Sequence, residues 1–233
     1  MRIARIALLG MGACAACAYA GCGGSPAARP DAAGNGPGDA GACGIDRFVT
    51  GELVDLDSTT ALFKGVLGAR LTVEGVPARS STTAPNGRFQ LCAPPAGAIT
   101  LDVDAPGDYL DGKAYIEAEA LGAPALSLRT YTRARGAALY AFDPSRGHVL
   151  IYLAGDRSDL TLSRAHGAPL AGNDDDGDGA LAWEAGNAGR YVLFPNVDVS
   201  SPTIELGGDP RGPHTLPVAA GQLTLAAIFF VYF

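Results

Sequence analysis

The fold class of this chain is decided by the stretch GRFQLCAPPAGAITLDVD, residues 87–104. Apolar and polar residues alternate in two short runs, and Pro94-Pro95 stands between them. An alternation with a period of two places one face of a β-strand in a core and the other face in water. Proline ends a strand because it lacks the backbone N–H that a ladder needs. The stretch therefore predicts two half-buried strands with a sharp connection between them.

Similar runs flank this stretch along most of the chain. In the first half they cover residues 48–55, 69–75, 79–84, 112–118 and 125–131. In the second half they cover residues 147–154, 159–164, 180–184, 190–197, 202–206, 214–219 and 222–233. Turn sequences such as Pro85-Asn86-Gly87 separate the runs. Short strands at this spacing predict an all-β fold made of Greek-key-type β-sandwiches.

The composition supports a folded, turn-rich protein. The chain has 233 residues, with 32 Gly and 16 Pro, yet 48% of its residues are apolar and only 18% are charged. Collagen requires Gly at every third position, and no such period occurs here. A disordered chain would lack the apolar runs described above. These two classes are therefore excluded.

The N-terminus has the pattern of a bacterial export signal. Arg2 and Arg5 precede an apolar segment over residues 6–20, which is too short to span a bilayer comfortably as a helix. The sequence YAGC, residues 19–22, resembles the lipobox, in which a cysteine that follows small residues is acylated. Its first position departs from that pattern, because Tyr stands where Leu, Val or Ile is usual. Because the small residues Ala20 and Gly21 match the pattern, we expect a lipid on Cys22. This lipid would hold the protein at a membrane without a spanning helix.

The signal region leaves one alternative open. Gly23, rather than an acidic residue, follows the cysteine, and this resembles the sorting pattern of the outer membrane. Residues 1–21 would then be a lipoprotein signal peptide. Ordinary cleavage near Ala20 would instead give a freely secreted protein.

Three further segments are predicted after the signal peptide. Residues 22–46 are rich in Gly, Pro and Ala and predict a disordered tether. Residues 47–133 predict a first sandwich and residues 134–233 a second sandwich-like domain in tandem. The alternative is one sandwich followed by an unrelated β domain.

Charge restricts the partners of the chain. Loss of residues 1–21 removes two arginines and no acid, so the net charge of −7 becomes −9. An acidic chain without a basic cluster binds nucleic acid poorly. We expect a membrane partner through the lipid anchor and an envelope protein or a glycan as the other partner.

Two cysteines remain beyond the signal region, Cys43 and Cys92. In an oxidising compartment a lone pair of cysteines predicts one disulfide. The long loop that it closes would stabilise the fold by about 3–4 kcal/mol in the chain-entropy description.

The first half resembles a known family. GELVD at 51–55, GARLTV at 68–73, NGRFQL at 86–91 and APGDY at 105–109 follow the order of its motifs. They are similar to the carboxypeptidase regulatory-like, or transthyretin-like (prealbumin), β-sandwich over residues 48–110. The resemblance implies a non-catalytic domain, and it also implies a second function, as an accessory subunit of a secreted hydrolase.

The resemblance is weaker elsewhere. Residues 192–197 and 216–225 are similar to two strands of the same family, which suggests related tandem domains. The insertion Ser58–Lys64 lengthens the first hairpin and departs from the simplest form of the family.

An acidic segment, NDDDGDG at 173–179, predicts a calcium site. Asp174, Asp176 and Asp178 offer oxygen ligands at alternate positions beside glycines, as in the first half of a calcium loop. Glu184 is a further candidate ligand, although it falls at the eleventh position and not the twelfth. The alternative is a solvated acidic hairpin tip without an ion.

Other residue types predict no catalysis. The three histidines, His148, His166 and His214, show neither H-x-H nor H-E-x-x-H spacing, so we expect no zinc site. No G-x-S-x-G sequence occurs. We therefore expect a binding or spacer module of the cell envelope and not an enzyme.

Aromatic residues offer one further alternative. Trp183, Tyr109, Tyr115 and Tyr131 would form a carbohydrate-stacking surface if they shared one face. With the acidic segment, this gives an alternative function as a calcium-dependent carbohydrate or protein adhesion module.

Overall fold

The computed structural model describes residues 43–122, 126–154, 159–174, 178–209 and 211–229. The predicted signal peptide, the lipidation residue Cys22 and the tether as far as residue 42 lie outside these ranges. Nearly all regular structure within them is β, which confirms the predicted fold class. None of the helices within these ranges is long and apolar enough to cross a membrane.

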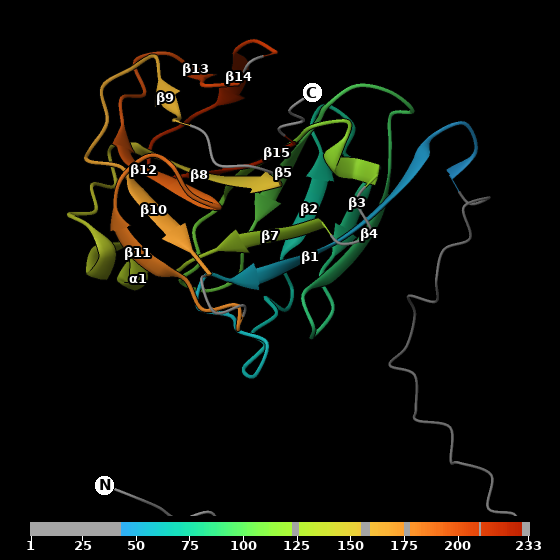
Figure 1. The fold of residues 1–233 in the computed structure, drawn as a ribbon. Coiled ribbons are helices and arrows are strands. Elements are labelled where there is room, and N and C mark those ends of the chain that lie inside the picture. Colours follow the sequence, from blue (N-terminus) through green and yellow to red (C-terminus); the bar gives the residue numbers. More distant parts are fainter. Residues whose placement is uncertain (1–42, 123–125, 155–158, 175–177, 210, 230–233) are drawn as a thin grey trace, which may run out of the picture. The chain divides into compact units, whose positions relative to one another are not determined.

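Three sheets form the described fold (Figure 1). The N-terminal sheet has the order β4 (Arg88–Ala93), β1 (Arg47–Asp55) and β7 (Leu126–Thr130). The central sheet has the order β11 (Ala182–Ala185), β10 (Leu170–Asn173), β12 (Tyr191–Val197), β8 (Gly147–Ala154), β15 (Leu223–Phe229), β6 (Gly112–Ile116), β5 (Ile99–Asp104), β2 (Arg70–Val73) and β3 (Ser80–Thr82). The C-terminal sheet has the order β14 (His214–Pro217), β13 (Thr203–Gly207) and β9 (Thr161–Leu162).

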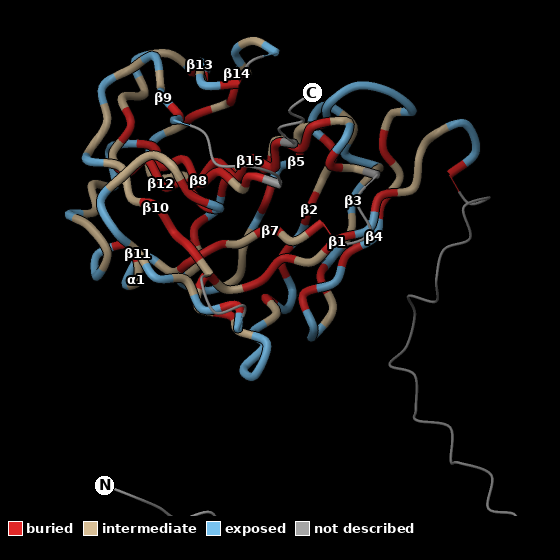
Figure 2. The backbone as a smooth tube through the Cα atoms, in the orientation of Figure 1, coloured by how far each residue is buried: buried red, intermediate tan, exposed pale blue. Residues whose placement is uncertain are grey.

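A first hydrophobic core lies between the N-terminal sheet and one face of the central sheet. Leu53 of β1, Phe89 of β4, Leu101 of β5 and Leu225 of β15 meet there, and each is at most 4% exposed. Figure 2 shows the buried residues along the facing strands. The alternation that predicted half-buried strands therefore produces a sandwich, because one face of each sheet is covered by the other.

A second core covers the opposite face of the central sheet. Val149 and Ile151 of β8 pack with Phe194 of β12, Ile204 of β13 and Leu216 of β14. β8 and β15 contribute alternate residues to both cores. Strands that are buried on both faces have nearly continuous apolar sequences, as these two strands do.

β15 connects the two halves of the chain. It runs parallel to both of its neighbours, and Leu223 is aligned with Gly112 of β6 on one side and with His148 of β8 on the other. A Cβ atom at Gly112 would lie 1.8 Å from the carbonyl oxygen of Leu223, so this close approach requires glycine. The described residues belong to one compact unit, and the predicted division into domains at residue 133 is not confirmed.

Three local predictions need correction. β10 was not expected, because its sequence LAGN lacks β-branched residues. No regular element was expected between the runs at 125–131 and 147–154, yet Arg133–Leu139 forms helix α1, whose first turn is capped by the Thr132 side chain. Residues 43–46 were assigned to the tether, but Cys43 and Asp46 are held against the fold. A short 3-10 helix, η2 (Ala120–Gly122), precedes β7.

Candidate functional site

The acidic segment forms the connection between β10 and β11. The Asp174 carboxylate accepts a hydrogen bond from the Gly179 N–H at 3.0 Å, and the Asp178 carboxylate accepts one from the Ala180 N–H at 2.6 Å. Asp176 lies outside the described residues. Glu184 is exposed on β11. Among the described residues, Asp174, Asp178 and Glu184 do not form a close three-donor group, so calcium binding here stays a prediction.

The insertion Ser58–Lys64, which was expected to lengthen a hairpin, instead lies in the connection between β1 and β2, which belong to different sheets, and it contacts this acidic segment. The backbone N–H of Thr60 donates to the carbonyl oxygen of Asp178 at 2.6 Å, and the Thr60 hydroxyl donates to the same oxygen at 2.8 Å. Within the insertion, the Leu62 N–H donates to the Thr59 hydroxyl and the Lys64 N–H donates to the Ser58 hydroxyl. These bonds hold the loop in one conformation, although its tip is exposed.

Arg129 connects the same two segments from inside the fold. Its guanidinium donates to the carbonyl oxygens of Leu56 and Ser58, at 2.9 and 3.0 Å, and to that of Gly179 at 3.2 Å. It also lies over the Tyr191 ring, 5.2 Å from the centroid. Hydrogen bonds from a charged donor are stronger than neutral ones. Arg129 therefore joins the insertion to the acidic hairpin.

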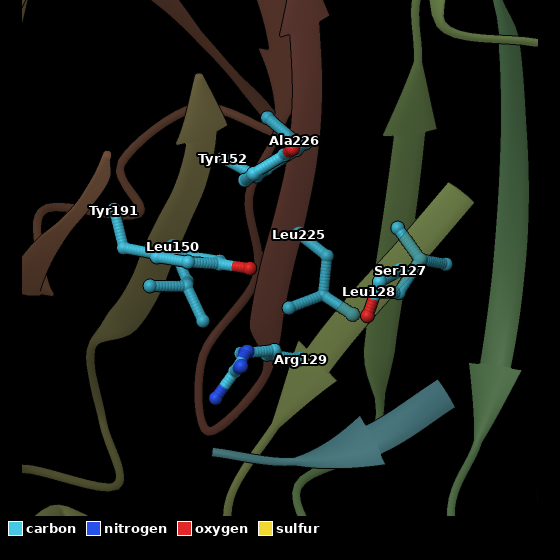
Figure 3. A pocket seen from close by; sticks show the side chains of 8 residues that line it. All are labelled: Ser127, Leu128, Arg129, Leu150, Tyr152, Tyr191, Leu225 and Ala226. Carbon is cyan, nitrogen blue, oxygen red and sulfur yellow. The ribbon is translucent and has the colours of Figure 1, made fainter. Parts of the chain in front are cut away.

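The pocket beside Arg129 is too small for a ligand. Figure 3 shows its lining side chains, which come from β7, β8, β12 and β15. Its volume is about 10 Å³, which is close to the space that one water molecule needs. We interpret it as a packing defect between the sheets and not as a binding site.

A larger groove lies on the N-terminal sheet. Its volume is about 350 Å³, within the range of ligand sites. It is lined by Thr50, Gly51, Glu52, Arg88, Phe89, Gln90 and Leu126. Arg88 and Glu52 form an ion pair at 3.0 Å across its wall. The groove offers polar groups of both charges around a small apolar floor, and no serine, cysteine or histidine is among these lining residues.

Exposed apolar residues lie on the connection between β1 and β2. The large apolar side chains that the described residues expose are Ile45, Leu62, Phe63 and Leu67, and the last three belong to the segment 58–67. Leu62 is 61% exposed, Phe63 49% and Leu67 57%. Single exposed apolar residues are common, but a local group of them is typical of an interaction site. We call residues 58–67 the apolar loop.

A cluster of charged residues lies where the C-terminal sheet meets β6. The turn between β13 and β14 brings His214 Nε2 to 2.6 Å from Asp209 Oδ2. Arg211 from the same turn donates to Asp209 Oδ2 at 2.7 Å and to Glu117, directly after β6, at 2.9 Å. The Tyr115 ring meets the His214 ring edge-on. Sequence reasoning missed this group because Glu117 is more than 90 positions away from Asp209, Arg211 and His214 along the chain.

Charge pairing in this cluster lowers the pKa of Asp209. Burial alone would raise that pKa, but hydrogen bonds from Arg211 and His214 stabilise the carboxylate more strongly and lower the pKa to about 2. Glu117, Asp209 and His214 are also the group of metal-binding side chains that the described residues bring together, with donor atoms within 4.8 Å of one another.

A second buried polar group surrounds His148, which is fully buried on β8. Its Nδ1 accepts the Asn196 N–H at 3.3 Å and lies 3.1 Å from the Tyr140 hydroxyl, which contacts the Tyr131 hydroxyl at 2.8 Å. The Phe142 ring stacks on the imidazole with centroids 4.5 Å apart. This group is part of the packed interior and is not a ligand site.

The predicted aromatic surface is not brought together. Tyr131 is fully buried, and the Tyr109 hydroxyl donates to Asp55 at 2.7 Å. Trp183 packs over Gly172, where a Cβ atom would lie only 3.0 Å from the indole ring. Tyr115 lies at the charged cluster. These four aromatic residues therefore lie in four different places in the fold.

Comparison with known proteins leaves the family open. No protein-family model matches the chain, and no curated protein matches it either. Among solved structures, the Bacillus anthracis TIE protein is similar to it over 79% of this chain, with 17% identity and a TM-score of 0.26. The match covers 34% of that protein, so the chain spans about a third of its length. The function has to be argued from the residues themselves.

Proposed function

We propose that the chain is a non-enzymatic, lipid-anchored binding module of the cell envelope, and that a protein partner binds at the apolar loop. The observation that carries this proposal is the exposure of Leu62, Phe63 and Leu67 on a loop that is braced by hydrogen bonds. The lipid on Cys22 and the transthyretin-like character of residues 48–110 are further parts of the proposal. They rest on the sequence motifs.

The energetics favour a protein partner at this loop. Complete burial of a Leu or Phe side chain is worth about 1.5–3 kcal/mol. A braced loop loses little conformational freedom on binding, so more of that free energy appears as affinity. The acidic net charge of the chain opposes contact with nucleic acid and with anionic surfaces. A neutral apolar pocket on an envelope protein, such as a secreted hydrolase, fits this surface.

Photo-crosslinking in cells tests the binding function. We expect a benzophenone amino acid at Phe63 to give one dominant crosslinked product, at least tenfold above the same probe at Thr203. Thr203 is also exposed but lies on the C-terminal sheet. Adding Leu62→Ser should reduce the product severalfold, and Cys22→Ala should move the chain from the membrane fraction to the soluble fraction. Equal products from both probe positions would contradict the proposed binding surface.

A second candidate function is calcium-dependent adhesion. The observation that favours it is the long ion pair of Asp174, whose carboxylate lies 3.9 Å from the Arg190 guanidinium. The Asp174 side chain is only 11% exposed. A nearly buried carboxylate beside further acids is stabilised by a divalent cation. The ion would lie next to Thr60 and so would stiffen the apolar loop.

Thermal melting tests this candidate. At a calcium concentration of roughly 100 times Kd, binding adds about 2.7 kcal/mol of stability, which corresponds to a rise in Tm of about 5–10 °C. We expect this rise in calcium relative to chelator, and its loss in the double variant Asp174→Asn/Asp178→Asn. An unchanged Tm in the unaltered chain would exclude the calcium site.

A further inference from the structure

We propose that Glu117, Asp209 and His214 bind a first-row divalent metal ion, with Zn²⁺ as the best match, and that the ion and the Arg211 guanidinium compete for the two carboxylates. This inference goes beyond the proposed binding function and concerns a different part of the fold. The ion would connect β6 of the central sheet to the β13–β14 turn of the C-terminal sheet. It would therefore act as a structural link between two sheets.

The geometry suits a small ion. The three donor atoms lie within 4.8 Å of one another, and tetrahedral zinc with bonds of 2.0–2.2 Å holds its ligand atoms about 3.4 Å apart. His214 Nε2 and Asp209 Oδ2 are 2.6 Å apart, so they must separate by less than about 1 Å to admit the ion. Asp209 lies on the β13–β14 turn and His214 is the first residue of β14, so a small movement of Asp209 on the turn is sufficient.

The donor set determines which ion fits. Two carboxylate oxygens and one imidazole nitrogen suit Zn²⁺ and its first-row neighbours, whereas Ca²⁺ and Mg²⁺ prefer oxygen ligands alone. The Asp209 side chain is 1% exposed, that of His214 10% and that of Glu117 12%. Two carboxylates at this depth require a cation, because an unpaired buried charge is strongly destabilising.

Arg211 supplies that cation in the structure. Its side chain is 31% exposed, so it can rotate towards solvent and leave both carboxylates to an ion. One guanidinium carries a single positive charge against two carboxylates, whereas a divalent ion with neutral His214 balances both. Arg211→Gln should therefore tighten metal binding, while loss of any of the three ligands should weaken it.

Zinc titration of the purified, chelator-treated chain tests the proposal. We expect one equivalent of Zn²⁺ to bind by calorimetry and to raise Tm, with calcium having no competing effect. His214→Ala should weaken binding at least 100-fold, Glu117→Gln at least tenfold, and Arg211→Gln should strengthen it about tenfold. His166→Ala is the matched control, because His166 lies outside the cluster, and it should leave the affinity unchanged.

A second measurement tests the site in the unaltered chain, so it does not depend on whether any variant folds. Co²⁺ added to the unaltered chain should give the visible d–d absorption of a tetrahedral site, and Zn²⁺ should abolish it stoichiometrically. Absence of Zn²⁺ binding up to millimolar concentration would overturn the proposal. Binding that persists unchanged in a folded His214→Ala variant would overturn it as well.

Discussion

Replacing both Cys43 and Cys92 by serine should lower the free energy of unfolding by about 4 kcal/mol. The structure joins these residues in a disulfide across 49 positions of the chain, and the chain-entropy description assigns about 4 kcal/mol to closing a loop of this length. Cys92 lies on β4, an edge strand of the N-terminal sheet whose neighbour in the sheet is β1. The disulfide therefore attaches the segment that precedes β1 to this edge strand. The corresponding fall in Tm is about 8–16 °C for a unit of this size.

Urea unfolding measures this effect, and reduction provides the control. Dithiothreitol should destabilise the unaltered chain to the same degree and should leave the double variant unchanged. The urea m-value should increase in the variant, because the uncrosslinked unfolded chain exposes more surface. A loss below about 1 kcal/mol would show that strain in the native bridge cancels the entropic gain.

Local sequence patterns predicted most strands, but they could not predict the pairing of strands. The alternation over residues 87–104 returns as β4 and β5, which lie in two different sheets. The run at 222–233 predicted a strand, and residues 223–228 of β15 are buried. However, its position between β6 and β8 depends on parallel pairing with strands roughly 75 and 110 residues away, which no local pattern encodes. Helix α1 could have been predicted from Thr132 as an N-cap before a helix-forming run.

Local sequence patterns were also insufficient to predict the charged cluster. Asp209 and His214 are five positions apart and meet at a turn, which sequence spacing could suggest. Glu117 joins them only because β6 and the β13–β14 turn lie side by side in the fold. Metal motifs such as H-E-x-x-H report ligands on a single element, so a site assembled from separate sheets gives no such signal. The acidic segment 173–179, by contrast, was visible in the sequence because its carboxylates are contiguous.

Mild acid should destabilise the fold through His148. The Nδ1 of this imidazole accepts the Asn196 N–H, so the neutral ring carries its proton on Nε2. Protonation would place a charge in the interior and would break this bond. Burial therefore lowers the pKa of His148 to about 4, and the nearby Asp143 carboxylate opposes this only weakly.

The lowered pKa of His148 makes the fold less stable as the pH falls. Because the folded pKa lies below the unfolded value of about 6.5, the stabilisation is complete above pH 6.5 and is lost as the pH falls towards 4. The expected loss is about 2 kcal/mol at pH 5 and about 3 kcal/mol at pH 4. Asp209, whose pKa is lowered to about 2, contributes its own loss only below roughly pH 4, so the two windows are separate.

Urea unfolding between pH 7.5 and pH 4.5 measures this loss, with His148→Asn as the matched variant. Asparagine keeps an acceptor near the position of Nδ1 but does not titrate, so its stability should change by less than about 1 kcal/mol over the same range, even if it is lower throughout. The imidazole resonance of His148 should titrate near pH 4 in NMR spectra of the native chain. An equal loss in the asparagine variant would assign the acid sensitivity to other groups. A loss confined to the unaltered chain would instead show that the buried imidazole, which Tyr140 connects to Tyr131 of the first core, and not the surface carboxylates, causes the loss of stability between pH 7.5 and pH 4.5.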